Sequence, residues 1–192
     1  MAKFEETPSQ TVGPFFHFSL DRPEWSDLAR AGAKGEKIVL EGRVLDGDGA
    51  PVVDALLEIW QANAEGKYDH PEDGQEKPVD PNFRGFGRAA TDAEGRYRFT
   101  TIRPGPVPGR GNALQAPHID VAIFARGLLN RLVTRVYFEG EALNEADPVL
   151  SSIDEPAVRR TLIARRANGQ GGAAYRFDIV LQGEGETAFF EV

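Results

Sequence analysis

The stretch "KIVLEGRVLDGDGAPVVDALLEIWQA", residues 37–62, decides the fold class. Apolar residues alternate with others through "KIVLEGRVLD", and the alternation returns in "PVVDALLEIWQA". This period of two is typical of β-strands with one buried face. The "GDGA" between them is a turn signal, which predicts a hairpin joining the two strands. We therefore expect a protein built on β-sheet.

Outward from this stretch, the same period recurs between turn signals. "GRAATDAEGRYRFTTI" predicts a second hairpin that turns at Asp92–Gly95. Further strands are predicted for "HIDVAIFA", "LVTRVYFEG", "AAYRFDIVLQ" and "TAFFEV". Two stretches rich in proline and glycine, residues 63–87 and 103–117, are predicted to be loops.

One helix is predicted late in the chain, in "SSIDEPAVRRTLIARRANG". Asp154 fits its cap, Pro156 its first turn and Gly169 its end. Many short strands with one late short helix favour an all-β sandwich, which we expect to be a single domain over residues 1–192. Residues 1–36 lack the period of two. They predict an extended N-terminal arm, and its phenylalanines indicate that it docks on a partner chain.

The composition limits the function. Apolar residues make up 41% of the 192, and no apolar run is long enough to span a membrane. The net charge of −8 disfavours nucleic acid and anionic lipid as partners. Cysteine is absent, which excludes disulfides and thiolate metal sites and suits a reducing compartment. No signal-peptide pattern opens the chain, so we expect a cytoplasmic protein.

The only local candidate for a metal site is the pair His118 and Asp120. Residues two apart on a strand face the same side, but an iron(II) site of two histidines and one carboxylate needs a further histidine, such as His70. From the residues alone the pair is a metal site, a lost metal site or an ordinary strand. A structural His118 bonded to backbone is the default. The sequence shows no nucleophile or phosphate-binding motif.

Several stretches, in order along nearly the whole chain, resemble the intradiol ring-cleavage dioxygenases. They include "TPSQTVGPFF", "LEIWQANAEGKY", "DPNFRGFGR", "TIRPGP" and "APHIDVAIFARG". The resemblance is closest to the protocatechuate 3,4-dioxygenases, and it implies a β-sandwich. It also implies cleavage of protocatechuate by iron(III) and O2 to 3-carboxy-cis,cis-muconate, within the beta-ketoadipate pathway. The family holds its iron with two tyrosinates and two histidines.

Compared with that pattern, this chain keeps only one ligand, His118. The second histidine position holds Asp120, and the two tyrosine positions hold Val107 and Gln75. An arginine that assists the substrate in the family is replaced by Gln115. The resemblance therefore implies a chain with no metal and no catalytic residue, like the alpha subunit of the family. Iron(III) is expected in a beta subunit, with which this chain would form a heterodimer inside a larger oligomer.

The resemblance also implies a substrate-binding role for four residues. Thr11, Gly13 and Pro14 match the arm segment that lines the partner's pocket, and Arg126 matches an arginine that reaches the bound acid. Phe15 stands where relatives have tyrosine. Two alternatives remain open: a free-standing β-sandwich module that binds aromatic acids or a protein, and a remodelled iron(II) enzyme that uses His118 and Asp120.

Overall fold

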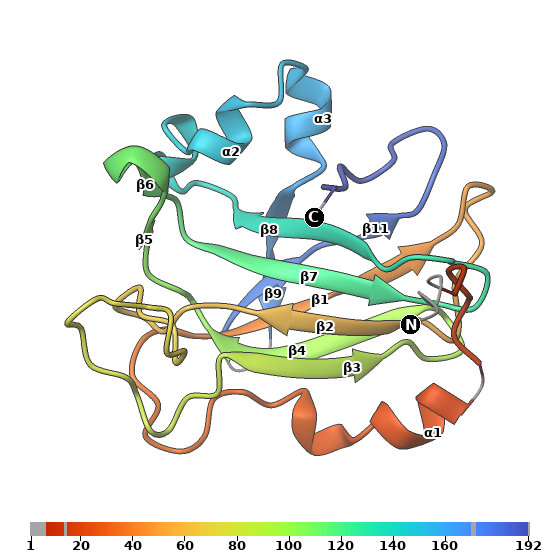
Figure 1. Ribbon diagram of the computed structural model, residues 1–192, viewed down its shortest axis with the longest axis horizontal. Helices are drawn as coiled ribbons and strands as arrows, with labels where there is room; N and C mark the ends of the chain where they lie inside the picture. Colours follow the sequence, from red (N-terminus) through yellow and green to blue (C-terminus); the bar gives the residue numbers. More distant parts are fainter. Residues whose placement is uncertain (1–6, 14, 170–171, 192) are drawn as a thin grey trace, which may run out of the picture.

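Two layers of β-strands form the body of the protein (Figure 1), as seen in a computed structural model that describes residues 7–13, 15–169 and 172–191. In the first layer β3 (Phe86–Ala90), β2 (Leu56–Trp60), β7 (His118–Phe124) and β8 (Leu132–Phe138) follow one another. In the second, β4 (Arg96–Ile102), β1 (Lys37–Leu45), β10 (Gly172–Arg176) and β9 (Ile163–Gly169) do so. The two-residue strand β11 (Ile179–Val180) pairs in parallel with the end of β1. The all-β prediction is confirmed.

The core lies between the layers, because each strand turns alternate residues inward. Ile38, Leu40 and Val44 of β1 are buried, as are Ile119 and Ile123 of β7. Full burial of one such side chain is worth about 1.5–3 kcal/mol. The period of two in the sequence is therefore the pattern of this core.

Both predicted turns form, but neither predicted hairpin does. Val52 N–H donates to Val44 O at 2.9 Å across the first turn, and Gly95 N–H donates to Asp92 O at 2.9 Å in the second, with Gly95 at φ +69°. Beyond the turns, however, β1 pairs with β4 and β10, while β2 pairs with β3 and β7. The prediction of paired hairpin strands is wrong, because a turn is fixed locally whereas pairing follows the burial of both layers.

The late helix is much shorter than predicted. Helix α3 covers only Pro156–Arg160, its N-cap residue is Glu155 rather than Asp154, and the chain then enters β9. Strand β9 pairs first with β8 and then with β10, so it links the two layers. The hydrogen-bond ladders of β9 outweigh the helical period of this segment, because helix propensity is a weak preference that tertiary context overrides.

Other short elements complete the structure. They are α1 (Phe15–Leu20), α2 (Pro148–Ser151), the 3-10 turns η1 (Pro23–Trp25), η2 (Arg110–Asn112) and η3 (Ala142–Glu145), and the two-residue ladder of β5 (Val107–Pro108) and β6 (Leu114–Gln115). The strand predicted in "TAFFEV" is wrong, since residues 187–191 form none. Within the described ranges, no helix has the length and apolar character that crossing a membrane requires.

The second half of the predicted arm packs on the chain itself. Leu28 N–H donates to Thr100 O at 2.8 Å, and Leu28 O accepts from Arg84 N–H at 2.9 Å. The Leu28 side chain is fully buried. Docking on a partner chain therefore stays a prediction for the earlier part of the arm, residues 7–13 and α1.

Candidate functional site

His118 opens β7 as a buried, neutral imidazole. Its Nδ1 lies 2.7 Å from Ala116 O, so Nδ1 carries the proton and donates it to that carbonyl. Burial lowers the pKa of His118, and the nearby Asp120 carboxylate offsets this only in part. The default interpretation of His118, a histidine bonded to backbone, agrees with this geometry.

Asp120 forms an ion pair with an arginine on the next strand. Asp120 and Arg135 face each other across β7 and β8, and Arg135 Nε lies 2.9 Å from Asp120 Oδ1. Arg135 also donates to Gln115 Oε1 at 2.7 Å. Although burial opposes its charge, the Asp120 carboxylate holds the pKa of Arg135 above its ordinary value. A permanent positive charge thus lies where the family resemblance places a metal ligand.

A buried aspartate that sequence reasoning missed, Asp147, accepts hydrogen bonds beside the start of β7. Asp147 Oδ2 accepts from Ala116 N–H at 2.8 Å, and its Oδ1 accepts from Val149 N–H and Leu150 N–H at 2.9 Å each. Tyr137 OH donates to the same Oδ1 at 3.1 Å. Asp147 therefore caps α2 and positions the start of β7. The sequence signal was present, since "DP" places an N-cap residue before a proline at the first helical position.

The two positions that the resemblance matches to family tyrosines, Gln75 and Val107, both line one cavity of about 690 Å³. It is lined by Trp60, Tyr68, His70, Glu72, Asp73, Gly74, Gln75, Val107 and Pro108. Gln75 donates to Gly66 O at 2.9 Å and to Asp73 Oδ2 at 3.1 Å, so its amide is already engaged. Trp60 pairs with Asp120 across β2 and β7, which places the Asp120 pair beside this cavity.

The donors around the cavity do not fit a ferric ion. Val107 has no ligating atom, and the Asp120 carboxylate is neutralised by Arg135, whose charge would repel a second cation. Tyr68 stacks on Trp60 with ring centroids 5.6 Å apart, and burial raises the pKa of its phenol, so it stays protonated. Among the described residues, no group of three or more histidine or carboxylate side chains is arranged to hold a metal.

His70 does not complete an iron(II) site either. It reaches the cavity with its ring edge-on to Trp60, but its Nδ1 accepts from Glu72 N–H at 3.1 Å. A site with His118 and Asp120 would need Asp120 free of Arg135. The geometry therefore gives no support to a remodelled iron(II) enzyme.

The predicted substrate-binding residues Thr11 and Arg126 come together at the other end of β7. Thr11 Oγ1 accepts from Gly127 N–H at 2.8 Å and lies 3.5 Å from Ala125 O, so the arm docks on both neighbours of Arg126. Arg126 is 76% exposed, with its Nε 3.3 Å from Asp54 Oδ2. Gly13 is exposed, with open space where a Cβ would lie. Pro14 lies outside the described residues.

These residues are remote from the chain's own cavity. Arg126 follows Asp120 by six residues, which is about 20 Å along an extended strand. Figure 1 shows the arm beside the arrowhead of β7, whereas β5 and β6 lie at its other end. The predicted residues therefore form two separate places, the cavity at Gln75 and Val107 and an exposed arginine held beside the arm.

The chain is similar to known proteins over nearly its whole length. A family model described as "Dioxygenase" matches residues 22–183. The protocatechuate 3,4-dioxygenase alpha chain of Pseudomonas putida is 44% identical over 97% of this chain and 96% of its own. The beta chain of Burkholderia cepacia is 48% identical over 93% of this chain and 77% of its own.

Solved structures share the fold. The dioxygenase domain of a carbohydrate-binding fusion protein from Streptomyces sp. SirexAA-E matches with a TM-score of 0.63 at 28% identity, covering 96% of this chain and 100% of that one. Catechol 1,2-dioxygenase from Pseudomonas arvilla C-1 matches with a TM-score of 0.64 at 25% identity, covering 82% and 55%. The chain therefore belongs to the intradiol dioxygenase family.

Proposed function

We propose that the chain is the alpha subunit of a protocatechuate 3,4-dioxygenase, which holds no iron and completes the substrate pocket of an iron-bearing beta subunit. The assembled enzyme would cleave protocatechuate with O2 to 3-carboxy-cis,cis-muconate. Identity alone does not separate the two kinds of subunit, since an alpha chain and a beta chain match at 44% and 48%. The replacement of ligand positions by Val107, Gln75 and the Asp120–Arg135 pair carries the proposal.

Arg126 supports a role for this chain in the partner's pocket. An exposed ion pair such as Arg126–Asp54 is worth little, so the guanidinium can leave it for an incoming carboxylate. The planar fork of arginine matches a carboxylate and keeps its charge at neutral pH. Thr11 fixes the arm beside it, which would present Gly13 along the same edge.

The remaining parts of the proposal follow from assembly. The beta subunit is the proposed partner, in a heterodimer that joins a larger cytoplasmic oligomer, with iron(III) in the beta chain.

The alternative function is a free-standing module for aromatic acids. It is suggested by the aromatic walls of the cavity, Trp60 and Tyr68. The Glu72 carboxylate in the same lining would repel an acid, so the alpha-subunit function is better supported.

Oxygen uptake with protocatechuate tests the proposal. The chain purified alone should show no turnover and no tightly bound iron, whereas the chain combined with a beta subunit should show both. Ring cleavage by the isolated chain, or a full complement of iron bound to it, would contradict the proposal. So would a beta subunit that reaches the same kcat/KM without this chain.

A further inference from the structure

The cavity at Gln75 and Val107 carries negative charge that no base in its wall balances. Its lining includes the carboxylates of Glu72 and Asp73 and contains no lysine or arginine. Asp73 is balanced from outside the lining by Lys67, whose Nζ lies 3.3 Å from Asp73 Oδ1. Glu72 is exposed, and none of the ion pairs formed by the described residues involves its carboxylate. One negative charge at this cavity is therefore uncompensated.

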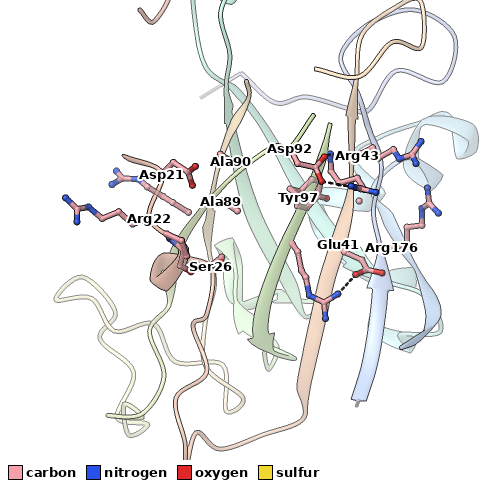
Figure 2. A pocket seen from close by; sticks show the side chains of 15 residues that line it. Asp21, Arg22, Ser26, Glu41, Arg43, Ala89, Ala90, Asp92, Tyr97 and Arg176 are labelled. Carbon is pink, nitrogen blue, oxygen red and sulfur yellow. Dashed lines mark hydrogen bonds and ion pairs between the residues drawn. The ribbon is translucent and has the colours of Figure 1, made fainter. Parts of the chain in front are cut away.

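The groove in Figure 2, which runs between residues 21–26 and strands β1, β3, β4 and β10, shows the opposite situation. Its arginines are balanced by nearby carboxylates, since Arg98 lies 2.6 Å from Glu41 and Arg96 lies 2.8 Å from Asp92. A charged ligand would compete there with partners that are already in place. The cavity offers its free carboxylate without such competition.

Aromatic rings form the wall of the cavity beside Glu72. Trp60 and Tyr68 stack with ring centroids 5.6 Å apart, and His70 lies edge-on to Trp60 at 6.3 Å. Glu72 N–H donates to His70 Nδ1 at 3.1 Å, which holds Glu72 next to these rings. The negative face of an aromatic ring attracts a cation within about 6 Å of its centroid. Three rings and the residue that bears the free carboxylate therefore lie within the span of one small ligand.

The ion pair of Asp120 and Arg135 has its negative member nearer to these rings. The strand register places Trp60 of β2 opposite Asp120 of β7, and Asp120 opposite Arg135 of β8. Burial raises the pKa of the Tyr68 phenol most, and among the charges Asp120 raises that pKa more than Arg135 lowers it. A metal ion would have to bind the Asp120 carboxylate itself, against Arg135. An organic cation needs only the ring faces, where the potential is negative.

We propose that this cavity binds a small organic cation, such as an alkylated ammonium ion, against the rings of Trp60 and Tyr68 and beside the Glu72 carboxylate. Its volume of about 690 Å³ lies within the range of about 300–1,000 Å³ that is typical of small-molecule sites. Tyr68 donates its backbone N–H to Asp73 Oδ2 at 2.8 Å, but its hydroxyl has no hydrogen-bond partner among the described residues. That hydroxyl is open to a polar group on the ligand. All of these residues come from this chain, so the inference does not depend on the proposed function.

Isothermal titration calorimetry on the full chain tests the site with choline and with 3,3-dimethylbutan-1-ol, which has the same shape without the charge. Choline should bind saturably, with about one molecule per chain and at least about tenfold more tightly than the alcohol. Benzoate should bind more weakly than choline, since Glu72 repels an acid. Trp60→Leu should weaken choline binding about three- to thirtyfold, because it removes a ring that faces the cation. Glu72→Gln should weaken it about two- to fivefold, because an exposed charge contributes less.

Tryptophan fluorescence places the ligand independently. The chain has two tryptophans, so the emission of the Trp25→Phe variant comes from Trp60 alone. Choline should change that emission with the same dissociation constant that calorimetry gives, whereas the alcohol should not do so in the same concentration range. An emission that choline leaves unchanged at saturation would contradict contact with the Trp60 ring.

Glu76→Gln is the matched control, because it removes the same charge from an exposed residue of the same loop that does not line the cavity. It should leave choline affinity unchanged, and circular dichroism should show that every variant is folded. The proposal is overturned if choline does not bind saturably, or if the alcohol or benzoate binds as tightly as choline. It is also overturned if Glu76→Gln weakens binding as much as Glu72→Gln, or if folded Trp60→Leu keeps the native affinity.

Discussion

At the scale of single residues, a pair of charges lies where the family resemblance places a metal ligand. Asp120 would be an acceptable metal ligand by itself, but Arg135 lies opposite it in the ladder and holds its carboxylate at 2.9 Å. Gln115 then accepts from the same guanidinium. The charges of Asp120 and Arg135 therefore balance each other without a bound ion.

Asp120→Ala should destabilise the chain, because it leaves a half-buried Arg135 without its carboxylate. We expect a loss of about 1–3 kcal/mol in the free energy of unfolding, measured with urea. The double variant Asp120→Ala with Arg135→Gln should recover part of that loss, since it also removes the unpaired charge. An unchanged unfolding midpoint in Asp120→Ala would show that the pair contributes nothing.

His118 should make stability depend on pH. Burial holds the pKa of His118 below its ordinary value, so the unfolded chain takes up a proton that the folded chain resists. Its contribution is therefore present above the unfolded pKa of about 6.5 and is lost as the pH falls below it. Urea unfolding at pH 7.5 and 5.5 should show a larger loss for the native chain than for His118→Gln. Equal losses would mean that His118 is protonated in both states.

At the scale of elements, one buried carboxylate joins a helix to a strand. Asp147 accepts from the first turn of α2 and from Ala116 N–H beside β7, and Tyr137 donates to it. Each of these donors is left unsatisfied when the carboxylate is removed. Such a loss costs more than the net value of a single hydrogen bond.

Asp147→Ala should therefore lower the free energy of unfolding by about 2–5 kcal/mol, because it removes a cap and a buried network together. Tyr137→Phe removes only one donor from the same network, so we expect about 0.5–1.5 kcal/mol. Urea unfolding of both variants checks the order. A cost for Tyr137→Phe equal to that of Asp147→Ala would show that the cap is unimportant.

The arm divides into two parts with different roles. Ser26 and Leu28 bond to Thr100 of β4, and Leu28 is buried, whereas Thr11 bonds to the backbone around Arg126. Deleting residues 1–13 should leave a folded chain with an almost unchanged unfolding midpoint, while deletion of residues 1–30 should unfold it. In the complex with a beta subunit, the shorter deletion should raise KM for protocatechuate. Unaltered kinetics would exclude a role for the arm in the partner's pocket.

At the scale of the whole molecule, about 20 Å of extended chain separates the cavity at Gln75 and Val107 from Arg126. An arginine that far away cannot serve the chain's own cavity, and the proposed function assigns it to the pocket of a partner subunit. The proposed function is therefore a property of the assembly.

Arg126→Ala should weaken apparent substrate affinity in the reconstituted complex by about ten- to a hundredfold, because it removes a charge-assisted hydrogen bond. Iron content should stay the same, and Arg126→Lys should recover only part of the affinity. Arg131→Ala is the matched control and should behave as the native chain. If KM does not change, or changes only in proportion to lost iron or lost assembly, Arg126 has a structural role alone.

The sequence by itself determined the elements that depend on neighbours along the chain. The period of two predicted β1, β2, β4, β7 and β8, and the "GDGA" and Asp92–Gly95 signals predicted real turns, because side-chain alternation and turn geometry are local. The family could also be recognised from the sequence, because recognition depends on residue identity, and the same comparison gave the expectation that Val107 and Gln75 stand at ligand positions.

Tertiary structure alone decided which strands pair and which side chains meet. The two turns cross between layers, and β9 replaces most of a predicted helix, because both outcomes depend on burial against segments distant in sequence. Packing also brings Asp120 against Arg135, and it brings Thr11 against the backbone around Arg126. Contacts between residues far apart in the chain are set by how the layers pack, and no local pattern encodes them.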